Sequence, residues 1–147
     1  MVLEIKKASA DDVTQVALLF DAYRVFYKQP SNLQAAFDFL EQRLTKDESV
    51  VFLAIFKGEA VGFIQMYPIF SSVSLKPAWL LNDLYVAEAS RNKGVGEALL
   101  QQAKQYGRET KAAFIILETA NDNYKAQSVY EKNGWIKTQE FFYEYPL

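Results

Sequence analysis

The stretch from residue 79 to residue 119 limits the possible folds more than any other part of this sequence. Residues 79–86 and 112–119 are strongly apolar runs, and the segment 94–108 between them carries apolar residues at helical spacing. A strand, a helix and a second strand in this order form a crossover in which the two strands lie parallel. The second run is apolar almost throughout, which is typical of a strand buried on both faces. The sequence therefore predicts a sheet with at least one parallel pair.

The N-terminal part predicts one short strand and two helices. Residues 2–7 form the strand. Ser9-Ala10-Asp11-Asp12 resembles a capping box, which would start a helix that ends before Gln29-Pro30. Ser31-Asn32-Leu33-Gln34 offers the cap of a second helix, whose apolar residues recur at helical spacing.

A hairpin is expected between these helices and the crossover. Residues 50–56 and 60–69 are rich in β-branched and aromatic residues, and a turn at 57–59 separates them. Residues 70–77 contain several serines and predict a loop before the strand 79–86.

After the crossover we expect one short helix and two strands. Asn121 or Asp122 would cap the helix, and Asn133-Gly134 would end it. Residues 135–138 and 140–145 would form the last strands. The complete order is β-α-α-β-β-β-α-β-α-β-β, an α/β chain with a mixed sheet.

Composition excludes several kinds of chemistry. The 147 residues predict a single domain over 1–147. The chain has no cysteine and no histidine, which rules out disulfides, a thiolate nucleophile, a Ser-His triad and cysteine- or histidine-based metal sites, so we expect no metal. A general base must be a carboxylate, a tyrosine, a lysine or a positioned water. The net charge of −2 speaks against a dedicated nucleic-acid partner.

The N-terminal residues carry no signal-peptide pattern. The longest apolar runs, 50–56 and 112–117, are far shorter than the ~20 residues of a membrane-spanning helix. We therefore expect a cytoplasmic protein without a membrane partner.

The segment Arg91-Asn92-Lys93-Gly94-Val95-Gly96-Glu97 lies between a predicted strand and a predicted helix. A helix N-terminus offers unpaired N–H groups and a positive dipole end, and glycines let the backbone approach an anion closely. This pattern predicts a phosphate-binding loop, although a tight strand-to-helix turn would also explain it. The P-loop pattern is absent, and Leu99 stands where the dinucleotide fingerprint needs glycine or alanine.

A second motif lies in the predicted short helix. Asn123, Ala126 and Tyr130 are three and four residues apart, so they share one helix face, and Gly134-Trp135 follows. Taken alone, this tyrosine would be an ordinary core or rim residue.

Together, R-x-x-G-x-G at 91–96 and N-x-x-A-x-x-x-Y-x-x-x-G-W at 123–135 resemble the GNAT superfamily of N-acetyltransferases. The predicted element order is similar to that fold over nearly the whole chain. The resemblance implies a twisted, mixed, mostly antiparallel sheet of about seven strands, flanked by about four helices. It also implies that the parallel strands 79–86 and 112–119 splay apart at the cofactor site.

The resemblance further implies that the chain binds acetyl-CoA. The pantetheine arm would lie along the backbone of Leu84, Tyr85 and Val86. The pyrophosphate would lie on the loop formed by Arg91, Asn92, Lys93, Gly94, Val95, Gly96 and Glu97. Asn123 and Tyr130 match the family's late motif and would complete the cofactor site.

The implied chemistry is direct acetyl transfer to an amine within a ternary complex. Tyr130 matches the general acid that protonates the leaving thiolate. Asp83, Glu118 or a bound water would take the amine proton, because an aliphatic ammonium has a pKa near 10. Related polyamine-type enzymes often carry a Glu-Asp pair where this chain has Asn82-Asp83, so Asn82 departs from that pattern. Asp83 and Glu118 could equally be structural residues.

The acceptor site implied by the fold is lined by the first two helices and the hairpin. Its candidate residues are Tyr23, Arg24, Tyr27, Tyr67 and Asn82, although each alone is as well explained by the core or the surface. Aromatic faces and carboxylates suit a cationic amine, which favours a primary amine of a small molecule, such as a polyamine-like or amino-acid-like acceptor. A protein or peptide acetyltransferase and a non-catalytic CoA-binding module are the alternatives. Family members are frequently dimers, so we expect a homodimer.

Overall fold

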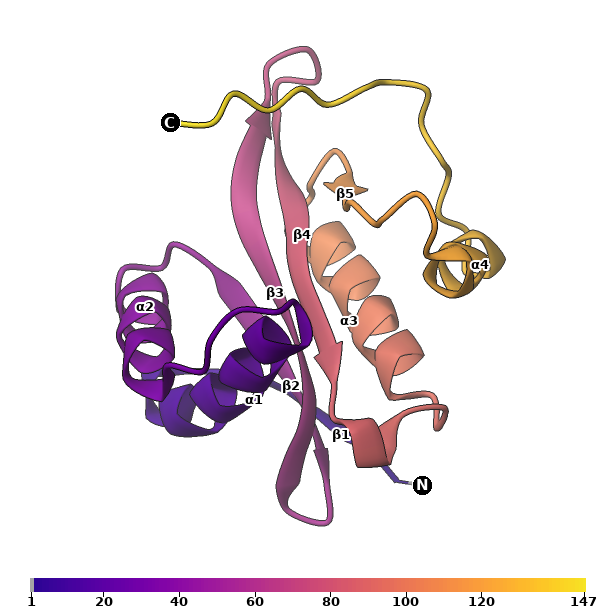
Figure 1. The fold of residues 1–147 in the computed structure, drawn as a ribbon. Coiled ribbons are helices and arrows are strands. Elements are labelled where there is room, and N and C mark those ends of the chain that lie inside the picture. The colour runs from indigo at the N-terminus through magenta and orange to yellow at the C-terminus, as the bar shows by residue number, and fades with distance from the viewer. Residues whose placement is uncertain (1) are drawn as a thin grey trace. The chain divides into compact units, whose positions relative to one another are not determined.

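The structure, a computed structural model, describes residues 2–147 (Figure 1). The chain divides into two compact units, Met1–Leu117 and Glu118–Leu147, and each is described by itself. The first unit carries the sheet, and the second carries the last helix. That both belong to one domain stays a prediction.

The first unit is built on a sheet with the strand order β1-β2-β3-β4-β5. The strands are β1 (Glu4–Lys7), β2 (Val50–Phe56), β3 (Glu59–Ser71), β4 (Lys76–Val86) and β5 (Ile115–Ile116). Neighbours are antiparallel except β4 and β5, which are parallel. The predicted mixed, mostly antiparallel sheet and its parallel crossover are therefore confirmed.

Helices cover both faces of this sheet (Figure 1). α1 (Val13–Phe26) and α2 (Leu33–Thr45) lie on one face, and α3 (Val95–Glu109) lies on the other. Phe63 of β3 belongs to the core under α1, where its ring contacts Tyr23. On the opposite face, Tyr106 of α3 contacts the rings of Phe52 and Trp79. A short 3₁₀ turn, η2 (Glu88–Ser90), connects β4 to the loop before α3.

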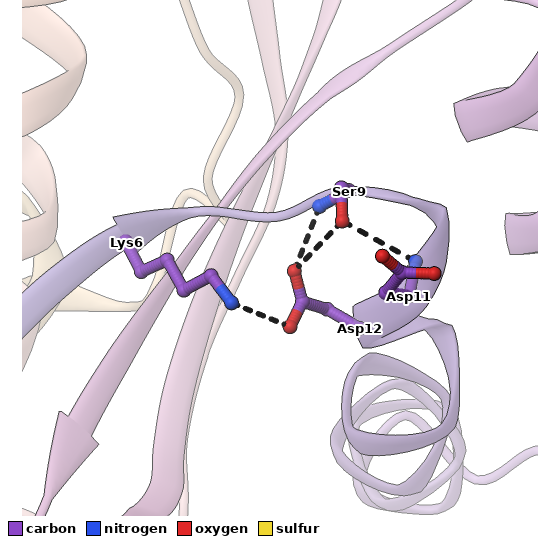
Figure 2. A network of polar contacts seen from close by, with 4 residues as sticks. All are labelled: Lys6, Ser9, Asp11 and Asp12. Atoms are coloured by element: carbon purple, nitrogen blue, oxygen red, sulfur yellow. Dashed lines mark hydrogen bonds and ion pairs between the residues drawn. The ribbon is translucent and has the colours of Figure 1, made fainter.

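The predicted capping box at the start of α1 is present (Figure 2). Asp12 accepts a hydrogen bond from the Ser9 backbone N–H at 2.8 Å and from Lys6 Nζ at 2.9 Å. The Ser9 hydroxyl accepts from the Asp11 backbone N–H. These bonds satisfy donors at the N-terminus of the 3₁₀ turn η1 (Ala10–Asp12), which leads into α1.

Burial by itself raises the pKa of Asp12, but the hydrogen bonds from Ser9 and Lys6 outweigh burial and leave that pKa below its usual value. The carboxylate therefore keeps its charge, and its bonds to Ser9 and Lys6, into mildly acidic solution.

Close backbone approach explains one glycine in the sheet. A Cβ on Gly62 of β3 would lie 2.9 Å from the Tyr85 carbonyl oxygen of β4 and 3.2 Å from a Val95 side-chain carbon of α3. Only a residue without a side chain lets β3, β4 and the start of α3 meet at these distances.

The second unit contains α4 (Tyr124–Lys132). Asn123 caps it by accepting a hydrogen bond from the Ala126 N–H at 3.2 Å, so the predicted caps Asn121 and Asp122 were wrong. Gly134 has a φ of +87°, which agrees with the predicted glycine after the helix.

Several predicted strand boundaries were wrong. β3 and β4 extend into the predicted loop 70–77, leaving only residues 72–75 as the turn. β5 spans two residues instead of the predicted 112–119, and its residues are half-buried. The strands predicted at 135–138 and 140–145 are absent from the described residues. Aromatic and β-branched residues favour strands, but a strand needs a partner for its backbone hydrogen bonds. The described sheet therefore has five strands where about seven were expected.

Candidate functional site

A β-bulge at Asn82 places the first candidate residue. Gln65 of β3 pairs with Asp83 of β4, whereas the next β3 residue, Met66, pairs with Leu81, so Asn82 is the extra residue. Consecutive residues of β3 point to opposite faces. Asp83 and Leu81 therefore lie on opposite faces, whereas the regular alternation of a strand would put residues 81 and 83 on the same face.

The Asp83 carboxylate is buried, with 5% of the residue exposed. It accepts a hydrogen bond from Gln65 Nε2 at 2.8 Å and one from Asn82 Nδ2 at 3.0 Å. Gln65 was missed by the sequence analysis, because no local pattern links it to a residue 18 positions away. The remaining polar atom of its side chain, Oε1, is buried and has no hydrogen-bond partner in the described part of the chain.

Two phenols complete the polar cluster on this face, namely Tyr23 of α1 and Tyr67 of β3. Burial raises the pKa of Tyr23 far above its usual value, and the neighbouring Asp83 carboxylate raises it further through its charge and a hydrogen bond. Burial, reinforced by the charge of Asp83, raises the pKa of Tyr67 to about 12. Both phenols are therefore neutral at physiological pH.

Of the predicted acceptor residues, Tyr23, Tyr67 and Asn82 gather around Asp83 in this way. Tyr27 lies one helical turn beyond Tyr23, and their rings are 5.0 Å apart in an edge-on arrangement. Arg24 is not part of the cluster, because its guanidinium donates to the Pro30 carbonyl and so helps to order the connection between α1 and α2.

Beyond the bulge, the edge of β4 that faces away from β3 has no strand partner among the described residues, and we call it the open edge. β5 pairs with β4 only at Trp79 and Leu80 in the described residues, so the parallel strands do not stay paired up to Val86. The Ala87 N–H bonds to Val61 of β3. Because hydrogen-bonding direction alternates along a strand, the N–H and C=O groups of Leu84 and Val86 point away from β3, toward the open side. This arrangement agrees with the predicted splay.

The loop from Arg91 to Gly96 leads into α3. Gly94 is the N-cap residue, with a φ of +81°, and as a glycine it contributes no side-chain cap to the helix. A Cβ on Gly94 would meet no atom within 4 Å, and one on Gly96 would lie 3.9 Å from a Val86 methyl carbon. The N-terminus of α3 therefore presents a positively polarised surface that suits a phosphate.

The two basic residues of the loop are held by the protein. Arg91 Nε donates to the Val86 carbonyl at 2.9 Å, and the guanidinium lies over the rings of Phe26 and Tyr85. Lys93 Nζ donates to the Ala89 carbonyl. In this arrangement Arg91 ties the loop to both β4 and α1.

The remaining candidates, Glu118, Asn123 and Tyr130, belong to the second unit. Asn123 caps α4, and the Tyr130 ring lies 6.1 Å from that of Trp135. Their catalytic and cofactor-binding roles stay predictions, as do the cofactor-binding roles of Asn92, Val95 and Glu97 in the first unit.

The described residues contain no helix long and apolar enough to span a membrane.

Comparison with known proteins shows which family this chain belongs to. A model of the acetyltransferase (GNAT) family matches residues 16–135. An uncharacterized N-acetyltransferase of Bacillus subtilis, YhfO, is 45% identical over 139 residues, which cover 95% of this chain and 93% of that protein. A probable acetyltransferase of Haemophilus influenzae is 30% identical over 147 residues, covering 99% of each chain. The crystal structure of a probable acetyltransferase superposes with a TM-score of 0.93 at 44% identity, covering 98% of this chain and 97% of that one. Since the family model and both full-length relatives agree with the fold described above, the chain belongs to the GNAT family and is an acetyltransferase.

Proposed function

We propose that this enzyme transfers the acetyl group of acetyl-CoA to a primary amine of a small molecule, such as a polyamine-like or amino-acid-like acceptor. The observation that carries the proposal is the buried Asp83 carboxylate at the bulge of β4, a few residues before the open strand edge and the glycine loop. An anionic group among aromatic rings suits a cationic amine.

The chain has the features needed to hold acetyl-CoA, which would supply a reactive acetyl thioester. The outward-pointing N–H and C=O groups of Leu84 and the N–H group of Val86 would bind its pantetheine amides as an added strand would, whereas the Val86 carbonyl already accepts from Arg91. The uncapped N-terminus of α3, with Gly94 and Gly96, would hold the pyrophosphate. An N–H group of the Leu84–Val86 edge would also stabilise negative charge on the carbonyl oxygen during transfer.

Asp83 is the proposed general base. An alkylammonium ion has a pKa near 10, so a group of the enzyme must accept its proton before the nitrogen can attack. The Asp83 carboxylate would take this proton directly or through a water. Asn82 cannot act as a base, but its amide orients the carboxylate by donating to Oδ1. Glu118 remains the second candidate.

Tyr130 is the proposed general acid. A neutral phenol can give its proton to a thiolate, because the two groups have comparable pKa values. Tyr130→Phe would then retain cofactor affinity and lose most of its turnover. An unchanged rate in Tyr130→Phe would remove this residue from the mechanism.

Two experiments test the proposal in sequence. Thermal melting with acetyl-CoA, ATP and NAD in parallel should give a rise with acetyl-CoA alone, of about 5–10 °C at 100 times Kd. Release of free thiol from acetyl-CoA is then measured with 1,4-diaminobutane, amino acids and lysine-containing or N-terminally free peptides. A rise in melting temperature without thiol release would favour a CoA-binding module, and release with peptides alone would favour a protein acetyltransferase. Sedimentation of the same sample tests the proposed homodimer.

A further inference from the structure

The buried Asp83 carboxylate is surrounded by hydrogen-bond donors but has no cation beside it. It accepts bonds from Gln65 and Asn82, it lies close enough to the Tyr23 phenol to raise the pKa of that group further than burial alone does, and it makes no ion pair within the described part of the chain. Arg43 of α2 is close enough for its charge to act on Tyr67, but its guanidinium pairs with Glu48. A nearby positive charge strongly stabilises a buried anion, so this cluster is suited to bind a cation.

Gln65 adds a second acceptor to the same place. It lies opposite Asp83 in the β3–β4 ladder and is fully buried. Its Nε2 donates to Asp83, which fixes the orientation of the amide, because a flipped amide would set Oε1 against a carboxylate oxygen. Oε1 is then left as a buried oxygen without a donor among the residues that the structure describes, which is unfavourable until a ligand or a water supplies one.

We propose that Gln65 is a positioning residue for the acceptor, and that its Oε1 and the Asp83 carboxylate together accept two N–H bonds of a protonated primary amine. This inference rests on the proposed function and deepens it by naming the group that the site recognises, an alkylammonium ion. The protonated phenols of Tyr23 and Tyr67 line the site without adding charge.

The pair would also guide the proton-transfer step. Asp83 takes one proton from the ammonium nitrogen, so an N–H bond breaks, an O–H bond forms, and the electron pair stays on nitrogen. The bond to Gln65 Oε1 remains, because the neutral amine still has two N–H groups. Gln65 therefore holds the nitrogen in place when it becomes a nucleophile.

The arrangement predicts selectivity against tertiary and quaternary ammonium ions. A primary ammonium ion has three N–H bonds and can satisfy both oxygens. A tertiary ammonium ion has one N–H bond and cannot, and tetramethylammonium has none.

A titration followed by NMR tests the binding directly, without turnover. The side-chain NH₂ signals of Gln65 in the full-length, ¹⁵N-labelled protein are assigned by their loss in Gln65→Met. They should shift in a saturable way with butylammonium chloride and not with tetramethylammonium chloride at equal ionic strength. No saturable shift, or equal shifts with both salts, would overturn the inference.

Steady-state kinetics test whether Gln65 positions the acceptor amine. With 1,4-diaminobutane as acceptor, Gln65→Met should raise the KM for the amine about 10- to 100-fold and leave that for acetyl-CoA unchanged. The matched control is Gln101→Met, an exposed site on α3, which should change neither value. An unchanged KM for the amine, or an equal rise in Gln101→Met, would overturn the inference.

Failure of the proposed function looks different. In that case the wild-type protein would release no thiol with any amine, whereas the NMR titration would still decide whether Gln65 and Asp83 bind a primary ammonium ion.

Discussion

The candidate site has two parts, the bulge of β4 and the segment from Leu84 to Gly96, and they are built in different ways. At the bulge, the site consists of side chains from three elements, and Asp83, Gln65 and Tyr23 are buried or half-buried. From Leu84 to Gly96, the site consists mainly of backbone groups, namely an open strand edge and an uncapped helix N-terminus. We therefore expect side-chain substitutions to have strong effects at the bulge, the proposed acceptor end, and an added Cβ to have the main effect at residues 84–96, the proposed cofactor end.

The largest effect is expected at the acceptor end. Asp83→Asn keeps the shape of the side chain, and its Oδ1 can still accept from Gln65, but the proposed base is lost. Turnover should fall about 10²- to 10⁴-fold. Steady-state kinetics at saturating acetyl-CoA measure this, with the exposed Asp11→Asn as the control. Wild-type turnover in Asp83→Asn would leave Glu118 or a bound water as the base.

A glycine substitution tests the cofactor end. In Gly96→Ala the new Cβ finds room beside Val86, so the melting temperature should stay the same. The added methyl group should still block close approach of a phosphate and raise the KM for acetyl-CoA about 10- to 100-fold. Fluorescence or calorimetric titration with acetyl-CoA checks this value. An unchanged affinity would mean that the loop is only a turn.

Gly62→Ala should produce the opposite result, a loss of stability. Its Cβ would lie 2.9 Å from the Tyr85 carbonyl, a backbone atom that cannot move without disturbing β4. The free energy of unfolding should fall by about 1–3 kcal/mol. Urea denaturation measures it, with Gly96→Ala as the matched glycine substitution. If both variants were equally stable, the close approach of β3 and β4 would carry no energetic constraint.

The smallest effect is expected at the start of α1, which carries Tyr23 at some distance from its cap. Asp12→Ala removes the bonds to Ser9 and Lys6 and should cost about 1 kcal/mol near neutral pH. The pKa of Asp12 is lowered in the folded protein, so its stabilisation is complete above the unfolded pKa and is lost as the pH falls through the folded one.

Denaturation at neutral and at acidic pH checks this prediction. The difference between the wild type and Asp12→Ala should shrink in acid, whereas the neighbouring Asp11→Ala should differ little at either pH. A difference that stayed constant with pH would show that the charge of Asp12 is not involved.

Much of the fold was predictable, because its signals are local. The capping box at Ser9 and Asp12 joins residues three apart, and Asn32 caps α2 by accepting from the Ala35 N–H. The glycine loop at Gly94 and Gly96 was visible for the same reason, since its conformation depends on those residues themselves.

The errors arose where distant partners decide the outcome. The apolar run 112–119 has the composition of a long buried strand, yet only Ile115–Ile116 pairs with β4. Residues 135–145 have strand-forming side chains and no ladder in the described structure. Composition indicates which secondary structure a segment favours. Whether the segment forms a strand depends on another strand whose backbone N–H and C=O groups are available to pair with it.

By itself, the sequence determined the starts of the first two helices, the parallel crossover and the glycine loop before α3, since each depends on residues close together in the chain. Only the tertiary structure decided which face Asp83 occupies and which side chain meets it. The extra residue at Asn82 reverses the strand alternation, and the ladder brings Gln65 against a carboxylate 18 residues away. The register of two strands is set by contacts along their whole length.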